Sequence, residues 1–150
     1  MTSDSLKRFT GYLTYTLLII FLMYWGMGIQ RELRMAVGAK PALDRIYLNI
    51  LFRIFHPVII GLLLAAPGFI RELRKPGRRG YDWAKFLAIG IPMAYITMIP
   101  LIYVTQLFPK LDAVLPGFHS RIMDFSVLHI VSGVIFGYLI LGAYHKRRSE

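Results

Sequence analysis

Four ionisable side chains stand inside otherwise apolar stretches of this sequence and are its strongest candidates for chemistry. Arg53 and His56 lie in one stretch, and Asp124 and His129 lie in another. Charged groups are costly to place at such depth, so each is a functional candidate by default. Arg53 and His56 are three residues apart, which puts them on one face of a helix.

Two interpretations of these four residues remain open. In the first, Arg53 and Asp124 form an ion pair that clamps two helices together, and His56 and His129 hydrogen-bond to hydroxyls or water. In the second, His56 and His129, which we expect at matching depth on diagonal helices, are axial ligands of a b-type haem, and Arg53 pairs a propionate. Without haem, no metal site is expected.

Prolines in the same stretches free backbone carbonyl groups. Pro57 has no N–H and so cannot bond the carbonyl of Arg53. Pro92 and Pro100 have the same effect on the carbonyls of Ala88 and Ile96. Neighbouring helices commonly satisfy such groups.

The segment Ser126-Val-Leu-His129-Ile-Val-Ser132-Gly133 resembles part of the cytochrome b subunit that anchors succinate dehydrogenase. In that family the segment opens the first membrane helix, and its Ser and an Arg help to bind quinone. Here it opens the last apolar stretch, and Ile130 replaces the Arg. The resemblance covers about ten residues of 150, and we do not carry the family's function over to this chain.

The elements that must position these residues are four long apolar stretches. Each has the roughly 20 residues that a helix needs to cross a hydrocarbon core of about 30 Å. Hydrophobic residues make up 56% of the chain, and the mean hydropathy is +0.54. We predict an all-α, polytopic membrane protein, a four-transmembrane-helix bundle that forms a single membrane domain over residues 1–150. The predicted spans are residues 9–29, 47–70, 84–107 and 122–144.

The distribution of basic residues predicts the orientation. The N-terminal segment, the second connection and the tail together carry eleven Lys and Arg, whereas the first and third connections carry six. The positive-inside rule therefore places both termini in the cytoplasm. The net charge of +10 is more naturally explained by this topology and by anionic lipid than by nucleic acid. We expect a cell (plasma) membrane location.

Two further groups of residues are candidates for contacts. Gly133 and Gly137 form a small-xxx-small pattern that lets helix backbones approach closely, within the bundle or in a homo-oligomer. The second connection is rich in basic residues that would meet lipid head groups at the cytoplasmic face. These residues are Arg71, Arg74, Lys75, Arg78 and Arg79.

No catalytic motif is present at membrane depth, neither a carboxylate pair nor H-E-x-x-H nor a Ser/His/Asp set. The absence of cysteine excludes disulfides and thiolate sites. We therefore expect a non-enzymatic subunit, regulator or accessory factor that associates with other membrane proteins. The alternatives are a haem- or quinone-linked electron-transfer anchor and a small oligomeric transporter or channel.

Overall fold

The computed structural model describes residues 3–39, 42–74, 78–105 and 126–147. The described chain is almost entirely helical, as the sequence predicts. It also contains a two-stranded ribbon that the sequence pattern did not predict. In chain order the elements are α1 (Ser3–Ala39), α2 (Leu43–Arg74), β1 (Arg78–Tyr81), α3 (Trp83–Lys85), η1 (Phe86–Gly90), α4 (Ile91–Thr105), α7 (Ser126–Gly142) and β2 (Tyr144–Arg147).

Among the described residues, three continuous helical stretches are long and apolar enough to cross a membrane: Ser5–Ala39, Leu43–Arg74 and Trp83–Thr105. The fourth apolar helix, α7, is shorter, with 17 residues. The predicted residues 122–125 of the last span lie outside the described part of the chain. In the third stretch the helix widens to π-type over η1, just before Pro92, which cannot donate the usual bond to Ala88.

The first connection is much shorter than the apolar pattern of the sequence implies. Helix α1 continues past Ile29 to Ala39, and α2 begins at Leu43. The segment Gln30–Val37 contains no Pro or Gly and is rich in good helix formers, so nothing in it ends the helix. With 37 residues, α1 is about 55 Å long, well beyond the thickness of a hydrocarbon core.

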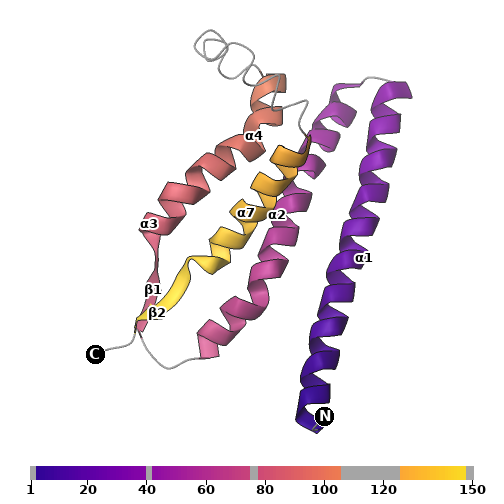
Figure 1. Ribbon diagram of the computed structural model, residues 1–150. Helices are drawn as coiled ribbons and strands as arrows, with labels where there is room; N and C mark the ends of the chain where they lie inside the picture. The colour runs from indigo at the N-terminus through magenta and orange to yellow at the C-terminus, as the bar shows by residue number, and fades with distance from the viewer. Residues whose placement is uncertain (1–2, 40–41, 75–77, 106–125, 148–150) are drawn as a thin grey trace.

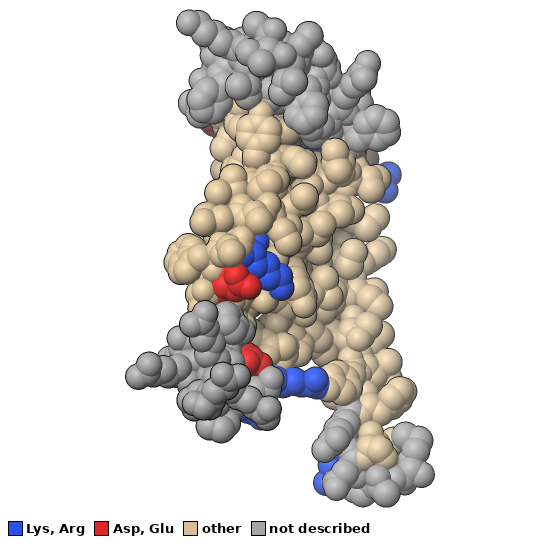
Figure 2. Space-filling view, turned by 60° about the vertical axis from the view of Figure 1, so that its left-hand side comes forward, with Lys and Arg blue, Asp and Glu red and all other residues tan. Residues whose placement is uncertain are grey.

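The long helical stretches alternate in direction, so that the start of α1 and the ribbon lie at the same end of the molecule (Figure 1). Helix α2 packs on α1 along one side and on α7 along another, and α4 packs on α7. Helix α1 therefore joins the other helices mainly through α2. On the face drawn in Figure 2 the described surface is largely uncharged, with its charged side chains in a few isolated places.

Glycines allow the backbones of α2 and α7 to touch. A Cβ atom added to Gly61 would overlap the Val134 carbonyl oxygen, and one added to Gly137 would overlap that of Val58. One added to Gly133 would lie 2.8 Å from the Cβ of Pro57. The expectation that these two helices are diagonal is therefore wrong, because their backbones are in direct contact.

The ribbon joins the second connection to the tail. Strands β1 and β2 pair antiparallel, with Tyr81 opposite Tyr144, and the Asp82 N–H donates to the Ala143 carbonyl at 2.8 Å. The Tyr144 ring packs edge-on against Phe69 of α2, with centroids 5.2 Å apart. The Tyr81 hydroxyl donates to the Ile140 carbonyl at 3.4 Å, and burial raises the pKa of this phenol, which favours its neutral donor form.

We expect Gly137→Ala to destabilise the protein by about 1–3 kcal/mol, because the added methyl group must push α2 and α7 apart. The matched control is Gly28→Ala on α1, where nothing lies within 4 Å of the new Cβ. That control should be neutral or slightly stabilising, because Ala favours a helix over Gly. Thermal unfolding in detergent measures both changes, and equal melting temperatures would contradict the close contact.

Candidate functional site

The structure distributes the predicted polar residues over two helices. Arg53 and His56 lie on α2, and His129 lies near the start of α7. Asp124 lies outside the described residues, so the predicted Arg53–Asp124 ion pair stays a prediction. Arg53 and His56 are half-buried, whereas His129 is only 1% exposed.

His129 reaches the carbonyl group that Pro100 leaves free on α4. Its Nδ1 atom lies 3.3 Å from the Ile96 carbonyl oxygen. Because a carbonyl can only accept, Nδ1 must carry the hydrogen and donate it. Pro100, four residues after Ile96, supplies no N–H that could compete within the helix. The imidazole therefore replaces the hydrogen bond that the helix lost.

A second carbonyl that a proline frees also lies near the same imidazole. The Arg53 backbone carbonyl, which Pro57 cannot bond, lies close to the His129 ring. The Nε2 atom of His129 is buried and makes no hydrogen bond with a described group.

Two buried hydroxyl residues, Thr97 and Ser132, accompany His129 at this level, each 1% exposed. The Thr97 hydroxyl donates to the Met93 carbonyl at 2.7 Å within its own helix. Small polar side chains therefore occupy the place where α4 and α7 approach α2. These residues form the most buried polar cluster of the described chain, and the prediction from sequence did not include Thr97 or Ser132 in it.

Tyr15 of α1 makes the same kind of hydrogen bond, to a carbonyl of α2 that a proline leaves without its helical donor. Its hydroxyl donates to the Leu63 carbonyl, and Pro67, four residues later, cannot bond that carbonyl. Sequence reasoning missed this pair because it did not consider Pro67 as a helix-internal proline. The signal was present in the spacing of Leu63 and Pro67.

His56 faces α1 and not His129. Its Nε2 atom lies 3.4 Å from the Leu22 carbonyl oxygen, and a Cβ atom added to Gly26 would overlap the ring. The ring also stacks on Phe52, with centroids 5.3 Å apart. The two histidines thus contact different helices, and the touching backbones of α2 and α7 leave no space between them for a porphyrin. The residues do not fit a bis-histidine haem.

Arg53 lines a cavity of about 140 Å³ between α1, α2 and α7. Among the described residues, no three His, Asp or Glu side chains gather in a way that could hold a metal ion. The cavity instead combines hydrogen-bond donors with apolar walls. Its described lining consists of Met23, Met27, Gln30, Phe52, Arg53, His56, Pro57 and Ile130.

Basic residues gather at the other end of the molecule. The Arg71 guanidinium lies 5.3 Å from the ring centroid of Tyr12, and Arg74 is exposed. Lys75 lies outside the described residues. In the ribbon, the backbone positions of Arg78 and Arg79 pair with Arg147 and Lys146. The ribbon therefore joins the basic part of the second connection to the basic tail, which sequence reasoning treated as separate segments.

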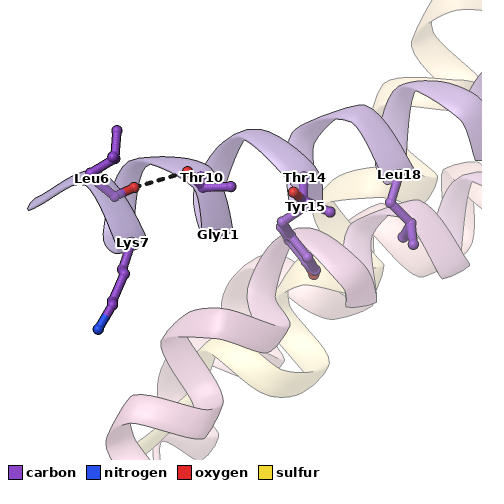
Figure 3. Close-up of a pocket in the computed structure, with 7 residues that line it drawn as sticks. All are labelled: Leu6, Lys7, Thr10, Gly11, Thr14, Tyr15 and Leu18. Carbon is purple, nitrogen blue, oxygen red and sulfur yellow. Dashed lines mark hydrogen bonds between the residues drawn. The ribbon is translucent and has the colours of Figure 1, made fainter. Parts of the chain in front are cut away.

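A groove runs along the N-terminal half of α1. A shallow hollow of about 610 Å³ is lined by α1 alone, with Lys7 and Gly11 in its first turns and Leu18 farther along (Figure 3). A second hollow of about 340 Å³ continues it between α1 and α2, past Ala66 and Pro67. We name these two hollows the α1 groove.

A scan of the chain against protein-family models found no match, and searches of curated proteins and of solved structures found no significant similarity.

We expect His129→Leu to destabilise the protein by about 1–3 kcal/mol, because it leaves the Ile96 carbonyl buried without a donor. Adding Pro100→Ala should recover about 1 kcal/mol of this loss, because residue 100 then donates to Ile96 within the helix. Denaturant unfolding of the single and double variants in detergent measures this coupling.

The same double-mutant cycle with Tyr15→Phe and Pro67→Ala is the companion test on the α1–α2 contact. Tyr15→Phe removes only the hydroxyl, so its effect isolates the hydrogen bond to Leu63. Additive effects in both cycles would show that these side chains do not replace the lost helical bonds.

Proposed function

We propose that this protein is a small integral membrane protein that acts non-enzymatically, as a subunit, regulator or accessory factor, by associating with other membrane helices. In this proposal the chain crosses the cell (plasma) membrane four times, and both termini face the cytoplasm. The three long apolar helices support a membrane location. The start of α1 and the ribbon lie at the same end of the molecule (Figure 1), which supports an even number of crossings.

The observation that carries the proposal is the exposure of α1. Among the described helices α1 packs mainly on α2, and many of its large apolar side chains are exposed. Phe21, Tyr24 and Trp25 are 64%, 77% and 58% exposed. A Cβ atom added to Gly11 or Gly28 would meet nothing within 4 Å. A long helix with open glycines and a groove offers the close backbone approach by which membrane helices associate.

The basic end of the molecule supports a second contact, with anionic lipids at the cytoplasmic face. Arg71 and Arg74 lie at the end of α2, beside the ribbon that brings the basic tail to the second connection. Each Lys or Arg near an anionic bilayer surface contributes about 1 kcal/mol of attraction. This attraction would hold that end of the molecule at the inner leaflet.

Site-directed crosslinking tests association through α1, and the chain is suited to it because it has no cysteine. We expect Leu18→Cys, on the α1 groove, to form a crosslink in native membranes with a bismaleimide reagent. The mass of the product distinguishes a second copy of this chain from a different membrane protein. Ala65→Cys, which is 4% exposed on α2, is the matched control and should remain uncrosslinked. The proposal fails if Leu18→Cys and Phe21→Cys both stay monomeric.

Reporter fusions test the orientation. A reporter that is active only in the cytoplasm should be active when it is fused after Glu150 and inactive when it is inserted at Ala42, between α1 and α2. The physical reason is the excess of basic residues at the end of the molecule that carries the ribbon. The reverse pattern would invert the topology.

A further inference from the structure

The hollow between α1 and α2 carries its charge at one end. Lys7 is its first lining residue along α1, and Ile70, directly before Arg71, is its last along α2. Because α1 and α2 run antiparallel, Lys7 and Arg71 lie at the same end of the hollow (Figure 1). The rest of the described lining is uncharged and consists of Gly11, Tyr12, Tyr15, Ala66 and Pro67.

The charged end lies where the apolar stretches of both helices stop. No Asp, Glu, Lys or Arg occurs from residue 9 to residue 30 or from residue 54 to residue 70. If both helices cross the bilayer, Lys7 and Arg71 lie at the level of the head groups. Tyr15 lies eight residues after Lys7, which is about 12 Å farther along the helix. The hollow therefore extends over most of the hydrocarbon of one leaflet, which is half of a core of about 30 Å.

The two basic groups remain available to an anion. The Arg71 guanidinium lies 5.3 Å from the ring centroid of Tyr12, and this contact positions the cation without neutralising it, because the ring is uncharged. Both basic side chains are exposed, and neither forms an ion pair with a described residue. Glu72 follows Arg71 along α2 but does not line the hollow. Lys7 and Arg71 together therefore suit a phosphate, which both side-chain types bind well.

Small residues leave space for a hydrocarbon chain beside this basic pair. A Cβ atom added to Gly11 would meet nothing within 4 Å, and Ala66 contributes only a methyl group to the lining. The volume of about 340 Å³ lies in the range of small-molecule sites, roughly 300–1,000 Å³. The Tyr15 hydroxyl already donates to the Leu63 carbonyl. That part of the wall therefore requires no hydrogen-bonding partner from an occupant.

We propose that the hollow between α1 and α2 binds one anionic phospholipid of the cytoplasmic leaflet. Its phosphate lies between Lys7 and Arg71, and one acyl chain passes Gly11 and Tyr15 toward the bilayer interior. Charge complementarity selects this occupant, because a zwitterionic head group brings its own cation to the two basic side chains. The inference deepens the contact with anionic lipid proposed above. It rests on the proposed membrane location and orientation but not on association through α1.

Native mass spectrometry tests the selectivity for charge. The protein in detergent is mixed with equal amounts of dioleoyl phosphatidylglycerol and dioleoyl phosphatidylcholine, and we expect it to retain one phosphatidylglycerol in preference. Lys7→Gln combined with Arg71→Gln should lower the affinity for phosphatidylglycerol at least about tenfold, because two charge-assisted contacts are lost. Arg31→Gln combined with Arg34→Gln is the matched control. It removes the same charge from exposed positions near the other end of α1 and should leave the affinity unchanged.

A second pair of variants tests the place of the acyl chain. Gly11→Leu fills the hollow without a clash and should abolish the preference for phosphatidylglycerol. Gly68→Leu makes the same change on α2, at an exposed position that is equally open but outside the lining, and should preserve it. Thermal unfolding identifies any variant that fails to fold, and the competition between the two lipids needs only the wild-type protein.

Four results would each overturn the inference. They are equal retention of the two lipids by the wild-type protein, equal losses in the two double variants, and an unchanged preference in folded Gly11→Leu, which would leave only diffuse attraction to the surface. The fourth is a bismaleimide crosslink from Ala66→Cys to another chain, which would place a protein helix in the hollow. A Leu18→Cys crosslink without a preference for phosphatidylglycerol overturns this inference alone, whereas the preference without that crosslink overturns only association through α1.

Discussion

The packing of this protein depends on backbone carbonyls that prolines leave without a partner. A helix in an apolar environment must satisfy its backbone groups internally, and each internal proline removes one donor. Here a side chain of a neighbouring helix takes the place of that donor. The Tyr15 hydroxyl donates to the Leu63 carbonyl that Pro67 frees, and His129 Nδ1 donates to the Ile96 carbonyl that Pro100 frees. Each of these side-chain hydrogen bonds fixes how two helices pack against each other, because the donor reaches only one carbonyl.

Helix α2 contacts each of the other long helices, α1, α4 and α7. It uses Gly61 to meet the backbone of α7 and its Leu63 carbonyl to hold α1. The contact with α7 is close because glycine hydrogens replace side chains on both helices. The contact with α1 instead relies on single features, such as Gly26 against His56. Helix α1 is accordingly the more exposed helix, and this difference in packing is why we assign association to it.

The sequence predicted the apolar helices well, because length and hydropathy decide them without reference to neighbours. It also identified the carbonyls of Arg53 and Ile96 as free. It did not predict which side chain would reach them, because that depends on the rotation of α7 about its axis. The first connection was misjudged for another reason. Charges such as Arg31 and Glu32 indicate where a span ends, but they are good helix formers and do not end a helix.

The two histidines show most clearly why depth alone does not define a site. His56 and His129 were expected at similar depth, and matching depth suggested shared ligation. Their surroundings differ because the side chains leave α2 and α7 in different directions. His129 is enclosed by α4 and donates to Ile96, whereas His56 meets α1 beside Leu22.

Close contact through Gly61 and Gly137 then excludes a large group from the space between α2 and α7. The space that remains lies on the α1 side of Arg53, where it is small and apolar along most of its wall. Helix packing, and not the choice of polar residues, therefore restricts what this molecule can bind.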